Sequence, residues 1–164
     1  MATQSDSYIV PDVLESGLTT VFCGRAPSPE SARRRAYYAH FSNKFWEILT
    51  ESGLTERQLD PEEYAQLPSY GIGLTDINKT EFGSDHELTG SGDNPRALFD
   101  KIEQFQPKIL AFNGKNNFRM FVNEAYGISK STPVDYGLQG ELTIKSTEIW
   151  VLPNTSARAR GYWD

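Results

Sequence analysis

The sequence predicts an α/β fold of three layers, with helices on both faces of a mostly parallel central sheet of about four to five strands. Short apolar runs of strand length alternate along the chain with segments of helical periodicity, as in proteins built from β-α-β units. Two apolar runs lead directly into loops of small and polar residues, Gly24-Arg25-Ala26-Pro27-Ser28 and Pro153-Asn154-Thr155-Ser156. Because ligands bind at the carboxyl ends of strands in open sheets, we expect these two loops to face each other across one cleft.

The composition suits one soluble domain spanning residues 1–164, with a flexible polar segment at about residues 1–10. No apolar run reaches the roughly 20 residues that cross a membrane. Cys23 is the only cysteine, which fits a reducing compartment, so we expect a cytoplasmic protein, and we expect it to be a monomer. The net charge of −6 argues against broad electrostatic binding of nucleic acid but leaves room for a local basic patch.

The first half of the chain is expected to hold one clear strand and several helix starts. The run 19–23 is apolar and bounded by Gly24, which is typical of a short buried strand. Ser28 then offers a hydroxyl of the kind that caps a helix. Apolar residues at helical spacing predict a helix over 43–50, and Asp60-Pro61 supplies the cap and first-turn proline of another.

The second half is punctuated by helix-breaking residues. Asn94-Pro95 opens a helix that Pro107 ends, and Gly127 stops the next one. The expected order is a strand or extended segment over 70–77, a polar surface loop over 79–92, the helix from Asn94, a strand over 108–112, a helix over 116–126, and a final strand pair over 142–144 and 148–152.

Eight short motifs in a fixed order carry a resemblance to a known family. They are Val21-Phe22-Cys23-Gly24, Ala39-His40, Asn43-Lys44-Phe45-Trp46, Leu74-Thr75-Asp76, Lys101-Ile102-Glu103, Gln106-Pro107, Asn113-Gly114-Lys115 and Ile149 to Ser156. In their order and spacing the chain resembles the mismatch-specific uracil/thymine-DNA glycosylase branch of the uracil-DNA glycosylase superfamily, from about Val21 to Arg160. The resemblance implies a base-excision-repair enzyme that flips uracil or another deaminated or mismatched base out of DNA and hydrolyses its N-glycosidic bond, without a cofactor.

The first loop departs from the family pattern. The usual motif is Gly-Ile-Asn-Pro-Gly, whose Asn positions the attacking water, whereas this chain has Ala26 at that position, with no donor or acceptor on its side chain. A Gly-x-Ala-Pro arrangement resembles another branch that handles the water with an Asp elsewhere. The resemblance therefore implies either a relocated water-handling residue or a weak or inactive protein that still binds DNA lesions. Candidates for relocation are Asp76, Asn78, His40 and Ser28.

Two of these candidates, Asp76 and His40, also have a purely structural interpretation. Asp76 lies at the end of a probable strand, where a carboxylate could orient water or stabilise a positively charged sugar, but it could equally cap a turn. His40 falls at a family His that could bond the base or a phosphate, although most lone histidines are structural.

The resemblance also implies residues that bind the base. These are Gly24 and Arg25 of the first loop, Tyr38, Asn43 and Asn154. Tyr38 aligns with an aromatic residue that stacks on the flipped base, or it packs in the core. Asn43 aligns with an Asn that reads the base edge, and it also suits the cap of the following helix.

A DNA-contacting loop is implied after the last strand. In the family this loop enters the duplex and fills the gap that the flipped base leaves. The corresponding residues here are Ser156, Ala157, Arg158 and Arg160, in which Arg158 replaces an apolar wedge. The first loop has no Lys, so we expect hydrolysis without a covalent lyase step. His40 and His86 are isolated in sequence, so we expect no metal site.

Overall fold

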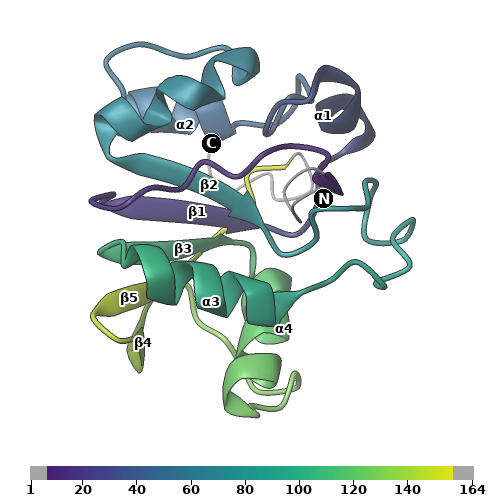
Figure 1. Cartoon of the computed structure of the whole chain (residues 1–164), viewed down its shortest axis with the longest axis vertical. Coiled ribbons are helices and arrows are strands. Elements are labelled where there is room, and N and C mark those ends of the chain that lie inside the picture. Colours follow the sequence, from purple (N-terminus) through teal and green to yellow (C-terminus); the bar gives the residue numbers. More distant parts are fainter. Residues whose placement is uncertain (1–6, 157–164) are drawn as a thin grey trace.

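The computed structural model describes residues 7–156, and five strands in this range form one sheet in the order β2-β1-β3-β5-β4. The strands are β1 (Thr20–Gly24), β2 (Ile72–Asp76), β3 (Ile109–Asn113), β4 (Gly137–Ile144) and β5 (Thr147–Leu152). β1 pairs in parallel with β2 and β3, and β3 in parallel with β5, whereas β4 is antiparallel to β5. The predicted α/β class and mostly parallel sheet are therefore confirmed (Figure 1).

Helices cover both faces of this sheet (Figure 1). They are α1 (Pro29–Arg34), α2 (Phe45–Glu51), the 3₁₀ segment η2 (Pro61–Tyr70), α3 (Pro95–Phe105) and α4 (Lys115–Tyr126). Alternate strand residues point into two separate cores: Cys23 and Phe112 pack under α3 and α4, while Phe22 and Ala111 pack under α2 and η2. None of the helices in residues 7–156 is both long enough and apolar enough to cross a membrane.

Helix starts follow local capping chemistry. The Ser28 hydroxyl accepts a hydrogen bond from the Ser31 N–H at 3.1 Å, so the predicted cap begins α1. Asn43 accepts from the Phe45 N–H at 3.0 Å, which turns the chain and starts α2 two residues later than expected. The predicted helix start at Asp60 is present, although the segment η2 is a 3₁₀ helix. At this start the Glu63 carboxylate accepts a hydrogen bond from the Asp60 N–H at 2.9 Å.

Three predictions about order and length are wrong. The expected flexible segment does not extend to residue 10, because the Ile9 N–H donates to the Lys79 carbonyl at 2.9 Å and Val10 is only 1% exposed. Lys79, placed at the start of a surface loop, is only 5% exposed. β4 is much longer than the predicted 142–144, because its polar, glycine-containing first half has no apolar alternation to reveal it.

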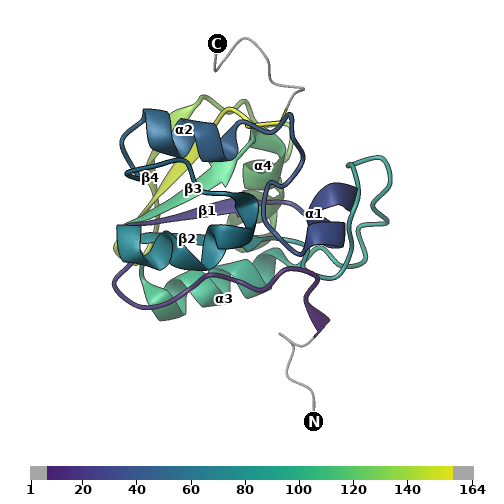
Figure 2. The same ribbon diagram turned by 90° about the horizontal axis from the view of Figure 1, so that it is seen from above.

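Parallel pairing brings the carboxyl ends of four strands to one edge of the sheet. In the register, Gly24 lies beside Asp76, and Asn113 lies beside Leu152. Figure 2 shows α1 and the loop that follows β2 at the same end of the sheet. The segments leaving β1, β2, β3 and β5 are thereby placed around one space.

Candidate active site

A cavity of about 720 Å³ lies at this edge of the sheet. Its lining includes residues 24–29 at the end of β1, Asp76 with residues 83–85, 87 and 88 at and after the end of β2, residues 113–117 at the end of β3, and Asn154 and Ser156 after β5. The segment between α1 and α2 adds Tyr38, His40 and Asn43. Ala26 and Ser156 both line it, so the two loops that the sequence predicts to meet do share one cleft.

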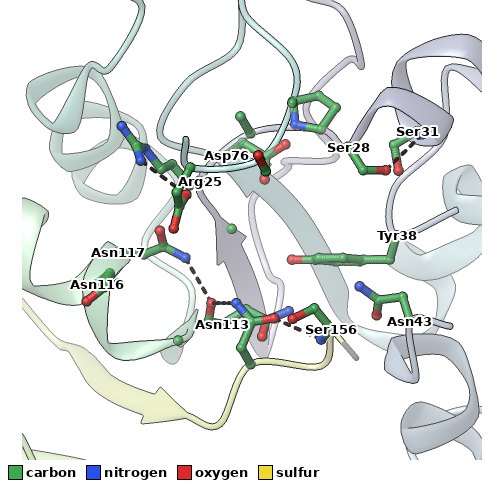
Figure 3. A pocket seen from close by; sticks show the side chains of 18 of the residues that line it. Arg25, Ser28, Ser31, Tyr38, Asn43, Asp76, Asn113, Asn116, Asn117 and Ser156 are labelled. Atoms are coloured by element: carbon green, nitrogen blue, oxygen red, sulfur yellow. Dashed lines mark hydrogen bonds and ion pairs between the residues drawn. The ribbon is translucent and has the colours of Figure 1, made fainter. Parts of the chain in front are cut away.

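Two polar groups converge on Gly24 inside this cavity. A Cβ atom at Gly24 would lie 2.7 Å from Asp76 Oδ1 and 3.2 Å from Tyr38 Oη, so only glycine leaves both groups room. Figure 3 shows Tyr38 reaching into the cavity with Asp76 on one side of it and Asn113 and Ser156 on the other. The carboxylate and the phenol therefore face the same small region from different elements.

Asp76 is an unusual carboxyl group. It is 5% exposed, and burial raises its pKa from 3.8 to about 6. The nearby Asp12 also raises this pKa, whereas Lys79, Lys101 and a hydrogen bond from the Gly24 backbone lower it. At neutral pH most Asp76 side chains are ionised, and they are more basic than an ordinary aspartate, which suits proton acceptance from water.

The Tyr38 hydroxyl is buried and has no hydrogen-bond partner within residues 7–156. Its backbone takes a positive φ of 51°, and its ring packs on Phe45 with centroids 4.2 Å apart. Burial, together with the charge of Asp76, raises the pKa of this phenol and outweighs the opposing effect of the nearby Asn113 amide, so the phenol stays protonated and can donate. Leaving a buried hydroxyl unpaired costs free energy, and such groups often await a ligand.

The remaining first-loop residues line the cavity but have partners of their own. The Arg25 guanidinium forms ion pairs with Asp93 at 3.0 Å and with Asp85 at 3.1 Å. Arg25, which the resemblance assigns to base binding, is therefore already paired with two carboxylates. The Ser28 hydroxyl is the cap of α1. Ala26 contributes only backbone and a methyl group to the lining.

Two other candidates for handling water lie elsewhere. Asn78 is fully buried, and its amide nitrogen donates to Glu81 at 2.6 Å and to Asp93 at 3.1 Å. It is not among the residues that line the cavity. His40 lines the rim, is exposed, and contacts Ser42 Oγ through Nδ1 at 2.6 Å, so it lies in solvent rather than beside the buried Asp76.

Sequence reasoning missed the role of Asn113. Its amide exchanges two hydrogen bonds with Thr155: Nδ2 donates to Thr155 Oγ1 at 3.0 Å, and Oδ1 accepts from the Thr155 N–H at 2.9 Å. The Thr155 hydroxyl in turn donates to Asn43 Oδ1 at 2.7 Å. The sequence does contain a signal for this role: Asn113 ends a strand and is followed by Asn116 and Asn117, which also line the cavity.

Asn43 and Asn154 both line the cavity, as predicted for base-binding residues. Asn43 also has its structural role, because its oxygen accepts from Phe45 and Thr155. Asn154 Nδ2 donates to the Asn113 carbonyl at 3.3 Å, and its Oδ1 accepts the Ser156 N–H at 2.8 Å. Ala157, Arg158 and Arg160 lie outside the described residues.

Within residues 7–156, no group of three or more His, Cys, Asp or Glu side chains could hold a metal ion. The two histidines are His40 at the rim and His86 in the loop after β2. The polar groups deepest in the cavity include the Asp76 carboxylate, the Tyr38 hydroxyl and the surrounding amides, and charged side chains such as Lys115 also line it.

Comparison with known proteins supports this assignment of fold and family. The chain is similar to the solution NMR structure of a provisionally assigned uracil DNA glycosylase from Methanosarcina acetivorans, with a TM-score of 0.62 and 21% sequence identity, over 94% of this chain and 88% of that one. At this identity the likeness concerns the fold. The model of the Uracil DNA glycosylase superfamily matches residues 11–163 of this chain. A match across nearly the full sequence shows that the protein belongs to the uracil DNA glycosylase superfamily.

Proposed function

We propose that this protein is a monomeric DNA glycosylase that removes uracil or another deaminated or mismatched base during base-excision repair. The observation that carries the proposal is the convergence of the buried Asp76 carboxylate and the unpaired Tyr38 hydroxyl on Gly24, in a cavity of about 720 Å³. This volume accommodates a nucleotide turned out of the helix. Extrusion is needed because a stacked base hides the bond to be cut.

Asp76 is the residue to handle the attacking water. Gly24 and Asp76 are partners in the β1–β2 register, so β2 brings a carboxylate next to the loop in which Ala26 lacks a polar side chain. In the step we envisage, water attacks C1′ of the sugar, its proton passes to Asp76, and the C1′–N electron pair leaves with the base. A pKa of about 6 suits a general base at neutral pH.

The base departs as an anion, so hydrogen-bond donors near its oxygens stabilise the transition state. The Tyr38 hydroxyl is such a donor, because it is protonated and has no partner within residues 7–156. The amide of Asn43 lines the same cavity and offers a second donor. Together they offer the departing base two hydrogen-bond donors within the cavity.

The proposal is tested by excision assays on oligonucleotides that carry U:G, T:G, hypoxanthine or xanthine, followed by alkaline cleavage. Cleavage of at least one substrate by wild type, and its loss in Asp76→Asn, is the expected result. Tight lesion binding without cleavage by wild type would favour the alternative, a lesion-binding protein without glycosylase activity. That alternative is motivated by Ala26.

A monofunctional enzyme leaves an intact abasic site. Lys115 also lines the cavity, with Nζ 4.3 Å from the centre of the Tyr136 ring, so a lysine-dependent lyase step is open to direct measurement. We expect no covalent DNA complex after borohydride reduction. A trapped complex that disappears in Lys115→Ala would show that strand cleavage accompanies excision.

A further inference from the structure

Phe41 is the most exposed large hydrophobic side chain in residues 7–156, with 94% of its surface accessible. The next most exposed, Phe82, is at 54%. A phenylalanine that is buried typically removes about 150–250 Å² from water, so the exposed Phe41 ring forgoes this hydrophobic stabilisation. The exposed ring is therefore accessible to a binding partner.

The turn that carries Phe41 (residues 40–44) is held in place at both ends. The Ala39 N–H donates to Ser31 Oγ at 3.0 Å, which ties the turn to α1. The Asn43 N–H donates to the His40 carbonyl at 2.9 Å and closes the turn. The Phe41 ring itself stacks on His40, with centroids 4.7 Å apart and an interplanar angle of 28°.

This turn is also bonded to the loop that follows β5. The Lys44 N–H donates to the Thr155 carbonyl at 3.0 Å, and the Thr155 hydroxyl donates to Asn43. The turn therefore stands beside the loop that the family resemblance assigns to entering DNA. His40, Ser42 and Asn43 line the cavity, whereas Phe41 does not, so its ring projects outward at the cavity rim.

We propose that Phe41 is a stacking wedge, which inserts its ring against the base that loses its neighbour when the target nucleotide is extruded. The inference rests on the proposed function. The Phe41 ring stacks on His40 and is followed in sequence by the polar Ser42 and Asn43, and a single planar ring fits a base face better than a protein surface, which needs a larger apolar area. Aromatic wedges at base steps are an established way to hold a distorted duplex.

Stacking on one base is worth roughly 1–3 kcal/mol, so we expect Phe41→Ala to lower kcat/KM on duplex substrate by about tenfold or more. The same variant should lose less than about threefold on a single-stranded oligonucleotide, because no stack has to be opened there. Phe41→Trp, which keeps the stacking face, should restore duplex activity. Phe82→Ala, which removes the second most exposed ring, serves as the matched control and should behave as wild type.

A second readout does not depend on excision. In the Asp76→Asn background, 2-aminopurine placed beside the target base reports unstacking by its fluorescence, and Phe41→Ala should abolish the change that binding causes. Equal kcat/KM for Phe41→Ala and wild type on duplex would overturn the proposal, and so would equal losses on single and double strands. If wild type binds DNA but excises nothing, the glycosylase proposal fails. The fluorescence change would still show whether Phe41 inserts into the duplex, so the two proposals are tested separately.

Discussion

Tyr37 and Tyr38 are adjacent in sequence but have opposite environments. The Tyr37 hydroxyl donates to the Pro11 carbonyl at 3.0 Å and accepts from Lys79 Nζ at 2.8 Å. The Tyr38 hydroxyl has no partner within residues 7–156. Tyr38 has a positive φ of 51°, packs against the core cluster under α2 and brings its hydroxyl into the cavity, and we propose that it is the functional ring of the pair.

Replacing each tyrosine by phenylalanine should separate the two roles. Tyr38→Phe removes an unpaired hydroxyl, so the free energy of unfolding should stay within about 0.5 kcal/mol of wild type while single-turnover excision slows about tenfold. Tyr37→Phe removes the donor to the Pro11 carbonyl and one of the partners of the Lys79 ammonium, which keeps Asp12 at 3.0 Å, and should cost about 1–3 kcal/mol of stability. Urea unfolding and single-turnover rates measure both. A Tyr38→Phe protein with full activity would remove that hydroxyl from the mechanism.

The raised pKa of Asp76 leads us to predict how the rate of excision depends on pH. Only the ionised carboxylate accepts a proton, and burial raises its pKa to about 6. We therefore expect kcat for excision to be level near pH 8 and to fall as the pH drops through about 6. Single-turnover rates between pH 4.5 and 8.5 would reveal this limb, and a rate that stays constant down to about pH 4.5 would exclude Asp76 as the base.

The same carboxyl group lowers stability at neutral pH. Because its folded-state pKa is raised, folding favours the protonated form, so its stabilising contribution is present below about pH 4 and is lost as the pH rises through about 6. The difference between about 6 and the ordinary 3.8 corresponds to about 3 kcal/mol. Asp76→Asn should thus unfold at higher urea than wild type at pH 8, with little difference at pH 4. Equal stabilities at both pH values would contradict the raised pKa.

The loop after β5 is positioned by hydrogen bonds between side chains and backbone of three elements. Thr155 is 7% exposed and connects Asn113, at the end of β3, with Asn43, before α2. These contacts join residues 42 and 112 positions apart in the sequence. They fix both the amides that we propose to bind the base and the turn that carries Phe41.

Thr155→Val should test this connection, because it keeps the shape of the side chain and removes the hydroxyl. We expect a loss of about 1–3 kcal/mol of stability and a rise in KM for DNA, since the loop loses its fixed position. Thr147 is the matched control: it is fully buried at the start of β5, the strand that leads to the Thr155 loop, and its hydroxyl donates to the Pro107 carbonyl at 2.6 Å, at the end away from the cavity. Thr147→Val should lose similar stability with an unchanged KM. If both variants raise KM equally, the effect is a general loss of stability.

The amino-terminal segment is fastened across the sheet by a buried charge cluster. Asp12 contacts Lys79 Nζ at 3.0 Å and Lys101 Nζ at 2.6 Å, and it accepts the Thr75 hydroxyl at 2.6 Å. The cluster joins the start of the chain to β2, α3 and the loop between them. It also acts on Asp76, whose pKa Asp12 raises and the two lysines lower.

Asp12→Asn should therefore affect both stability and activity. It leaves two largely buried ammonium groups without their carboxylate, which should cost about 3 kcal/mol in urea unfolding. It should also move the acid limb of the excision profile to lower pH, because a negative neighbour of Asp76 is gone. Asp100→Asn, which breaks an exposed pair with Arg96, is the control and should change stability by less than about 0.5 kcal/mol. An unmoved acid limb would show that Asp12 does not influence Asp76.

The sequence by itself determined the class of the fold and most of its elements. Strand and helix periodicity, caps such as Ser28 and stops such as Gly127 are local properties, so they can be interpreted residue by residue. The predicted meeting of the two loops followed from a general rule about parallel strands. Where the local pattern was weak, as in the polar first half of β4, the prediction was wrong.

Only the tertiary structure decided which side chains form the site and in what state. The closeness of Asp76 and Tyr38 at Gly24, the pairing of Asn113 with Thr155 and the burial of Lys79 all depend on contacts between distant segments. Such contacts fix burial, and burial sets both the raised pKa of Asp76 and the unpaired state of the Tyr38 hydroxyl. The sequence shows which ionisable and polar groups the protein has. Their burial, and the pKa shifts that burial causes, arise only when strands far apart in the sequence pack side by side.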